Sequence, residues 1–293
     1  MSEYILSSCS SIDISPLKVK ELDLRILPFQ YTLGENQYMD DFFVSRSSEE
    51  FYGDMAKGMM THTSQNSVGE YMAFFEPFLK EGKDILHVLL SSGLSGTYQS
   101  AKTAVDMLKE FYPERRILLV DSLDASVGEG LLVAELAKEK KEGKSLDELY
   151  ESALAIRNKQ HLVFFPSTLK YLVRGGRVSK TAGAIGNAFH IVPLMRIDKD
   201  GKLLVIQKCI SSHIASHQLV KRVVQYARGG ADYDGTIFLG QGDDLRMAEK
   251  MTSLIEKEMP KAKVEVFSVG PTIGAHTGPG TILVGFWGEA DKD

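Results

Sequence analysis

Over the first half of the chain, short apolar runs alternate with stretches in which apolar side chains recur every three or four positions. Residues 85–90, ILHVLL, are typical of a buried strand, whereas the spacing of Tyr71, Phe74, Phe75 and Phe78 is typical of a helix. The pattern predicts strands near 4–7, 85–90 and 116–120, and helices near 48–58, 68–81, 96–111, 126–141 and 146–159. Strands separated by such helices are joined by crossovers, so we expect a parallel sheet covered on both faces.

The pattern changes just past the middle of the chain, where strands and helices no longer alternate. The turn sequence DKDG at 198–201, between apolar stretches 191–197 and 203–210, predicts a hairpin. Further strands are predicted at 161–165, 235–239, 263–268 and 281–287, and helices at 167–173, 181–188, 211–228 and 243–258. We therefore predict an α/β protein of two domains: a parallel-sheet α/β/α domain over 1–160, and a smaller α+β domain with a mixed sheet over 161–293.

A loop rich in hydroxyl groups follows the strand predicted at 85–90. Residues 91–101 read SSGLSGTYQSA and lead directly into a predicted helix. Backbone N–H groups at a helix start lack partners within the helix, and glycine lets a ligand approach closely, so such a loop can hold an anion. Ser92, Ser95 and Thr97 add neutral hydroxyl donors, which suit a carboxylate or phosphate. The plainer alternative is that Ser95 or Thr97 only caps the helix.

Three further segments share this small and polar character. Residues 63–67 read TSQNS ahead of a helical pattern, 174–186 read RGGRVSKTAGAIG, and 271–280 read PTIGAHTGPG before a strand-like run. With VDSLDASVGEGLLV at 120–133, these segments are similar to those of the DegV family, whose characterised members bind a fatty acid. The chain departs from the family pattern at Cys9, where the family usually has an aspartate.

The resemblance implies that the chain binds a long-chain fatty acid, similar to palmitate, stearate or oleate, between its two domains. It places Thr63, Ser92, Gly93, Ser95 and His276 at the carboxylate, which is costly to bury unless two or three donors hold it. Burial of the tail would supply the affinity, since each methylene contributes about 0.8 kcal/mol. The alternative for His276 is an ordinary role in a turn.

Apolar side chains around the Arg-Gly-Gly-Arg segment are candidates for the wall of a lipid tunnel, and most would equally serve as core in any protein. They are Phe164, Phe165, Ala184, Ile185, Phe189, Ile191 and Met195, with small residues at Ala182, Gly183 and Ala188. In the family, the lipid-binding protein presents its bound acid to a separate ATP-dependent fatty acid kinase. The resemblance therefore implies partner docking by Arg174, Arg177 and Lys180; the alternative is a solvated cluster of charges.

The composition suggests a cytoplasmic protein. The 293 residues carry a formal net charge of −5, which disfavours nucleic acid as a partner because proteins that track phosphates are usually basic. The two cysteines, Cys9 and Cys209, lie far apart and suggest neither a disulfide framework nor a zinc ribbon. No apolar run approaches the roughly 18 residues of a membrane span, so we expect no stable membrane insertion.

The motifs of common enzymes do not occur in the sequence, and we expect no metal or cofactor. The G-x-S-x-G elbow and the G-x-x-x-x-G-K-[ST] phosphate loop are absent, and His213 and His217 lack the glutamate of a zinc-binding helix. The favoured hypothesis is a lipid carrier without a catalytic centre of its own. The alternative is an enzyme acting on a phosphorylated or carboxylated metabolite, with Ser92 or Ser95 as nucleophile and His276 as base.

Overall fold

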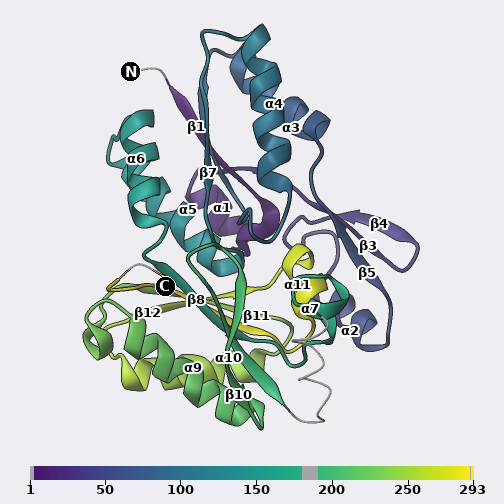
Figure 1. Cartoon of the computed structure of the whole chain (residues 1–293), viewed down its shortest axis with the longest axis vertical. Helices are drawn as coiled ribbons and strands as arrows, with labels where there is room; N and C mark the ends of the chain where they lie inside the picture. The colour runs from purple at the N-terminus through teal and green to yellow at the C-terminus, as the bar shows by residue number, and fades with distance from the viewer. Residues whose placement is uncertain (1–2, 180–190, 291) are drawn as a thin grey trace.

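The computed structural model describes residues 3–179, 191–290 and 292–293 and contains two large sheets, one above the other in Figure 1. The upper sheet has four parallel strands in the order β2-β1-β6-β7. Their bounds are β1 Tyr4–Cys9, β2 Arg25–Leu27, β6 Asp84–Leu89 and β7 Ile117–Asp121. The central strands β1 and β6 are buried along their whole length, as strands covered on both faces must be.

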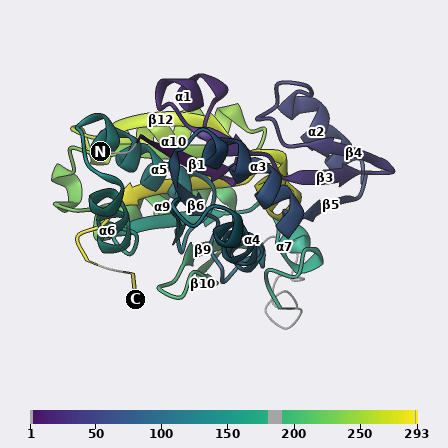
Figure 2. The same cartoon turned by 90° about the horizontal axis from the view of Figure 1, so that it is seen from above.

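Helices cover both faces of the upper sheet, as the alternating pattern predicts (Figure 2). One face carries α3 (Val68–Lys80) and α4 (Thr97–Phe111), and the other carries α5 (Ser126–Lys141) and α6 (Leu146–Ile156). Ser67 and Ser145 form capping boxes at the starts of α3 and α6, so the local sequence determines where these helices begin. Within the described residues, no helix is both long and apolar enough to cross a bilayer.

The lower sheet has six strands in the order β10-β9-β8-β13-β11-β12. Their bounds are β8 Gln160–Phe165, β9 Val192–Ile197, β10 Leu203–Cys209, β11 Thr236–Gln241, β12 Lys263–Ser268 and β13 Ile282–Trp287. β11 and β12 run parallel and the other pairs are antiparallel, which confirms the predicted mixed sheet and the β9–β10 hairpin. Helices α9 (Ser212–Tyr226) and α10 (Leu245–Glu258) cover the face away from the upper sheet (Figure 1). The helix predicted at 181–188 lies outside the described residues.

The structure also contains several short elements, most of which the sequence pattern does not predict. They are the 3-10 turns η1 (Ser10–Ile12) and η3 (Gly230–Asp232), helices α1 (Pro16–Glu21), α7 (Lys170–Arg174) and α11 (Pro271–Thr277), and strands β3 (Gln30–Leu33), β4 (Asn36–Met39) and β5 (Thr61–Ser64); α2 is Ser48–Ala56. Of these, α7 overlaps the short helix predicted at 167–173. Strands β4-β3-β5 form a third, antiparallel sheet. The prediction of a loop at 63–67 is therefore corrected, since Thr63 and Ser64 belong to β5, and 271–277 is a helix rather than a Gly-rich turn.

Helix α5 lies between the upper and lower sheets and is buried over most of its length. It touches η1 on one side and β8, β11 and β13 on the other. Glycines permit this close approach: a side chain at Gly130 would collide with the carbonyl oxygen of Ile12, and one at Gly285 would lie 3.0 Å from the carbonyl oxygen of Val127. One hydrophobic core therefore continues from the upper sheet through α5 to the lower sheet.

We predict that Gly130→Ala lowers the free energy of unfolding by about 1–3 kcal/mol, because the added methyl group overpacks the contact with Ile12. The control is Gly53→Ala in α2, where nothing lies within 4 Å of the added carbon. Alanine at that site should stabilise the helix by up to about 1 kcal/mol. Urea denaturation followed by circular dichroism measures both variants. Equal effects of the two substitutions would contradict the packing described for α5.

Candidate functional site

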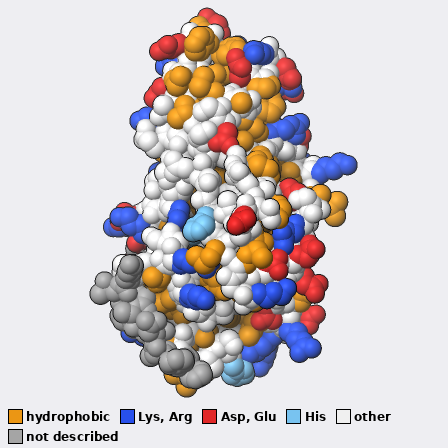
Figure 3. Space-filling model, turned by 90° about the vertical axis from the view of Figure 1, so that its right-hand side faces the viewer, with side chains coloured by type: hydrophobic (Ala, Val, Ile, Leu, Met, Phe, Trp, Pro, Cys, Tyr) orange, Lys and Arg blue, Asp and Glu red, His pale blue; other side chains and the backbone are white. Residues whose placement is uncertain are grey.

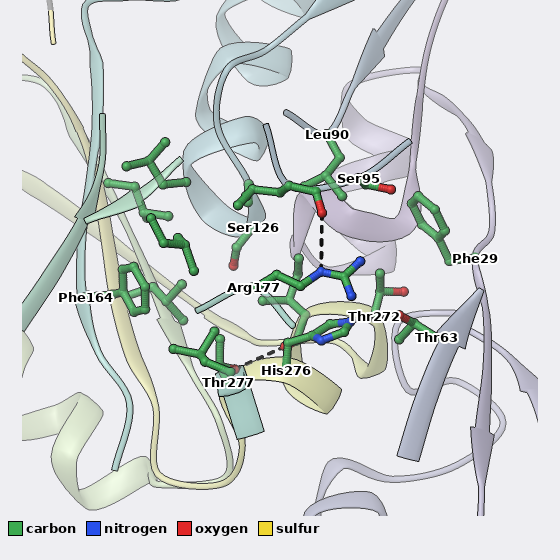
Figure 4. A pocket seen from close by; sticks show the side chains of 18 of the residues that line it. Phe29, Thr63, Leu90, Ser95, Ser126, Phe164, Arg177, Thr272, His276 and Thr277 are labelled. Atoms are coloured by element: carbon green, nitrogen blue, oxygen red, sulfur yellow. Dashed lines mark hydrogen bonds between the residues drawn. The ribbon is translucent and has the colours of Figure 1, made fainter. Parts of the chain in front are cut away.

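A pocket lies between the two large sheets, at the carboxyl ends of β6 and β7 (Figure 4). Its apolar wall includes Leu90, Leu94, Leu162, Phe164, Leu203 and Leu283. Polar side chains gather on the opposite side, where Figure 4 shows Thr63 beside His276 and Phe164 well away from both. A pocket with one polar side and one apolar side suits a molecule that has a polar head and an apolar body.

His276 and Thr63 meet on the polar side of the pocket although they lie 213 residues apart in the sequence. Nε2 of His276, on α11, is 2.8 Å from Oγ1 of Thr63, on β5. Burial, together with the nearby charges of Arg177 and Arg174, lowers the pKa of His276 to about 3. The imidazole is therefore neutral at pH 7 and carries a single N–H.

The position of that proton on the imidazole determines whether the Thr63 hydroxyl can donate a hydrogen bond to a ligand. Nδ1 of His276 has no hydrogen-bond partner among the described residues. A buried N–H without an acceptor is rarer than an unpaired acceptor, so we assign the proton to Nε2, which then donates to Thr63. The hydroxyl hydrogen of Thr63 is left to donate into the pocket.

The two glycines of the Arg-Gly-Gly-Arg segment have different roles. A side chain at Gly175 would collide with Nδ1 of His276, so this glycine provides space for the imidazole. An added carbon at Gly176 would meet nothing within 4 Å, but the φ angle of Gly176 is 74°. That backbone conformation favours glycine. The first glycine is therefore required by packing and the second by the turn.

Ser95 lines the same polar side, just before α4. Its Oγ lies 2.9 Å from Oγ1 of Thr97 and accepts a hydrogen bond from the Thr97 N–H at 3.3 Å. The N-cap position of α4 is occupied by Gly96, which has no side chain to cap with. Ser95 is therefore not at the N-cap position, but its oxygen accepts one of the free N–H groups at the helix start, as the plainer interpretation of the sequence expects in part.

Ser92 and Gly93, also predicted at the carboxylate, do not line the pocket. Ser92 is exposed, and its N–H donates to Asp121 at 3.1 Å. The Gly93 N–H donates to Oγ of Ser91 at 3.1 Å, and a carbon added at Gly93 would lie 2.7 Å from two carbonyl oxygens of the β9–β10 turn. Gly93 thus packs against the hairpin turn and Ser92 is exposed, and the hydroxyl that this loop brings to the pocket is that of Ser95.

Arg177 belongs to the pocket as well, where the sequence predicted a docking residue. Its Nε donates to the carbonyl oxygen of Leu94 at 3.3 Å, and a terminal nitrogen donates to that of Gly175 at 2.6 Å. Figure 4 shows its guanidinium between Ser95 and His276. Burial lowers the pKa of this guanidinium, which still remains charged at neutral pH.

Arg174 lies beside the pocket rather than in its wall. Its guanidinium contacts Sδ of Met60 at 3.3 Å and lies 5.0 Å from the centre of the Tyr171 ring. Figure 3 shows the right-hand side of the molecule as seen in Figure 1, where basic, acidic and hydrophobic side chains are mixed and a histidine lies near the middle. Lys180, the third residue predicted to dock a partner, lies outside the described residues.

Of the apolar residues predicted for the tail, the structure brings Phe164 to the pocket. Phe165 points into the core beneath α9 and α10, because successive side chains of a strand face opposite sides. Met195 is buried between the sheets but is not part of the pocket wall, and Ile191 does not line it either. The candidates between 182 and 189 lie outside the described residues.

The pocket also has hydroxyls that the sequence prediction does not place there, those of Ser64, Ser126, Thr272 and Thr277, and two of them meet buried carboxyl groups. Ser126 donates to Asp13 at 2.5 Å and Thr272 donates to Asp40 at 2.5 Å. Both carboxyls are fully buried, and burial raises the pKa of Asp40 to about 6 and that of Asp13 well above its usual range. These two hydroxyls are engaged with carboxyl groups, so Thr63 and Ser95 are the better donors for an anion.

A signal for Ser126 was present in the sequence. It follows β7 as Ser95 follows β6, and neighbouring parallel strands end at the same edge of a sheet, where ligands of α/β proteins commonly bind. Thr272 had no such signal, because its place depends on the packing of α11 against elements more than 200 residues away.

Hydroxyl donors and the Arg177 guanidinium on one side of the pocket, with apolar side chains on the other, are features of binding sites for amphipathic small molecules. Residues 9–289 match the family model described as an uncharacterised protein of the DegV family. The chain belongs to the DegV family.

Relatives of known sequence support this assignment along the whole chain. The chain is 33% identical to a DegV domain-containing protein of Clostridium perfringens, over 100% of both chains. It is 34% identical to the DegV domain-containing protein YteA of Lactococcus lactis, over 94% of both chains.

Solved structures share the fold at lower sequence identity. A stearic acid-binding protein from Eubacterium ventriosum has a TM-score of 0.85 and 22% identity, covering 96% of this chain and 97% of that one. The Streptococcus pneumoniae Fatty Acid Kinase (Fak) B3 protein, loaded with linoleic acid, has a TM-score of 0.84 and 22% identity, covering 98% of this chain and 100% of that one.

In the native protein, ionisation of Asp40 lowers the free energy of unfolding as the pH rises toward about 6. We predict that Asp40→Asn abolishes this pH dependence. An aspartate in the unfolded chain has a pKa of about 4, so between about pH 4 and 6 the folded protein retains a proton that the unfolded chain has released. The free energy of unfolding therefore falls as the pH rises through this range, whereas asparagine stays neutral. Urea denaturation of both proteins between about pH 4 and 7.5 measures the difference. A difference that does not vary with pH would contradict the raised pKa.

Proposed function

We propose that the protein binds a long-chain fatty acid, with its carboxylate at Thr63 and Ser95, with Thr63 oriented by His276, and with its tail along the apolar wall, and presents it to a separate ATP-dependent kinase. The observation that carries the proposal is the neutral Thr63–His276 pair on the polar side of an otherwise apolar pocket. The neighbours named as a stearic acid-binding protein and as a fatty acid kinase B3 protein support the ligand and the partner.

The chemistry of the pocket divides affinity and orientation between the two ends of the ligand. A tail of about sixteen carbons contributes on the order of 10 kcal/mol before ordering costs. The carboxylate adds little affinity but must be hydrogen-bonded once it leaves water. The uncharged hydroxyls of Thr63 and Ser95 can donate these hydrogen bonds, and the guanidinium of Arg177 in the same pocket adds a positive charge.

The enzymatic alternative finds less support in the same geometry. Nε2 of His276 lies on Thr63, and the Ser95 hydroxyl lies on that of Thr97, so neither candidate serine is paired with His276. The Ser7–His87 contact at 2.8 Å is buried in the upper sheet and does not line the pocket. Ser92, the other candidate nucleophile, lies outside the pocket. A nucleophilic serine requires a base within hydrogen-bond reach. The side chains are thus arranged to hold an anion rather than to attack one.

Thr63→Val and Ser95→Ala should each weaken the binding of palmitic acid by about 1–3 kcal/mol, because the carboxylate stays buried with one donor fewer. Binding of palmityl alcohol should change less. Calorimetric titration of delipidated protein with both ligands measures the difference, after mass spectrometry confirms removal of any retained lipid.

The control for these variants is Thr103→Val, which removes an exposed hydroxyl that donates within α4, far from the pocket. It should leave both affinities unchanged. Failure of the native protein to bind either palmitic acid or a fluorescent acyl probe at micromolar concentration would refute the carrier function. Equal losses for acid and alcohol would place Thr63 and Ser95 away from the carboxylate.

We predict that Arg177→Ala and Arg174→Ala have different effects on lipid affinity and on the rate of phosphorylation. Arg177→Ala should weaken lipid binding as well as slow phosphorylation by the cognate kinase, since its guanidinium lies in the pocket. Arg174→Ala should slow phosphorylation while leaving lipid affinity within about twofold, because its guanidinium does not line the pocket and a charge beside the site mainly affects encounter with a partner. The rate difference between Arg174→Ala and the native protein should shrink as salt screens the charge. A kinase assay beside a binding titration tests both, and identical behaviour of the two variants would contradict the assignment.

A further inference from the structure

We infer that Asp40 is a positioning residue for the carboxylate site: it holds helix α11 at the place where His276 meets Thr63. The inference rests on the proposed function, since it concerns the same site. It adds a buried acidic residue that does not line the pocket and acts on the site through α11.

Asp40 accepts hydrogen bonds from α11 one helical turn before His276. Its Oδ2 accepts hydrogen bonds from the N–H of Thr272 at 3.0 Å and from the hydroxyl of Thr272 at 2.5 Å. Thr272 and His276 are four residues apart, so they lie on the same face of the helix. The Asp40–Thr272 and Thr63–His276 contacts are therefore neighbouring attachments along that face.

Both attachments come from the same small sheet. Asp40 directly follows β4, and Thr63 lies on β5. β3 lies between them, pairing Gln30 with Met39 of β4 and Tyr31 with Thr63 of β5. The sheet thus sets the spacing between Asp40 and Thr63, and α11 must match that spacing to make both contacts.

Asp40 is itself held firmly. Its N–H donates to the carbonyl oxygen of Phe29 at 2.8 Å, and its Oδ1 accepts from the N–H of Phe42 at 3.3 Å. Gly270, just before α11, leaves room for this arrangement, because an added carbon there would lie 3.3 Å from both carboxyl oxygens of Asp40 and 2.9 Å from Oδ1 of Asp13.

Helix α11 depends on such contacts for its position. It has seven residues, and a helix of that length is not stable by itself. A displacement of about 1 Å would stretch the 2.8 Å contact of His276 with Thr63 beyond hydrogen-bond range. Burying a carboxyl group costs free energy, and an apolar residue at position 40 would avoid that cost. The role of Asp40 in holding α11 accounts for its presence.

The experiment compares Asp40→Ala and Asp40→Asn with Glu129→Ala, in full-length delipidated protein titrated with palmitic acid and palmityl alcohol. Glu129 is a matched control because it is also fully buried and accepts hydrogen bonds from Ser8 and Ser11, neither of which belongs to α11. We expect Asp40→Ala to weaken binding of the acid about tenfold and of the alcohol less than about twofold. Asp40→Asn retains one acceptor and should lose about threefold or less for the acid.

A spectroscopic measurement reports on the site without any ligand. In protein labelled with ¹⁵N histidine, the Nε2 signal of His276 should shift in Asp40→Ala and by a smaller amount in Asp40→Asn, but not in Glu129→Ala. If Asp40→Ala does not fold, the shift and the acid affinity of Asp40→Asn are compared with those of Glu129→Ala instead.

The outcomes separate this inference from the proposed function. Equal losses for acid and alcohol in the Asp40 variants, or an unmoved His276 signal, would overturn the positioning role while lipid binding by the native protein stands. A native protein that binds no palmitic acid would overturn the proposed function, and the His276 signal would still test whether Asp40 sets the contact with Thr63.

Discussion

The close packing of α5 between the two large sheets is the constraint on which the rest of the structure depends. Gly130 and Gly285 let the backbones approach, and one hydrophobic core runs through the helix from sheet to sheet. This packing brings the start of α5 to the pocket, where Ala125 and Ser126 line it. Because the helix start is buried, its polar groups need internal partners, and the carboxyl of Asp13 meets the hydroxyl of Ser126 there.

Neutrality is the main electrostatic feature of the polar side. Burial keeps His276 uncharged, so the imidazole orients Thr63 rather than pairing with an anion. The positive charge on this side comes from Arg177, whose guanidinium also donates hydrogen bonds to two backbone carbonyl oxygens. Hydrogen bonds from neutral groups fix the direction of a carboxylate without binding it as tightly as a dedicated ion pair would. In the proposed function, such a site leaves affinity to the apolar wall, so that the head group can be presented to a second protein.

The longer elements of the fold were predictable from the sequence because each one buries a continuous face. The alternation in the first half led to the parallel sheet with helices on both sides, and the turn at 198–201 led to the β9–β10 hairpin. The three-stranded sheet was not predictable, since strands of four residues are too short for a clear alternation. Helix α11 was not either, because its glycine-rich sequence is typical of a turn and its helix is held by Asp13 and Asp40.

By itself, the sequence determined the fold class, through local periodicity, and it determined the segments that carry the polar groups, since these are residues adjacent in the chain. The family was indicated by the resemblance of those segments to known motifs. Tertiary structure decided which members of those segments face the pocket: Ser95 rather than Ser92, and Phe164 rather than Phe165. It also joined Thr63 to His276 across 213 residues. The physical reason is that local patterns specify the conformation of a segment, whereas the direction of a side chain within it depends on how distant elements pack around it.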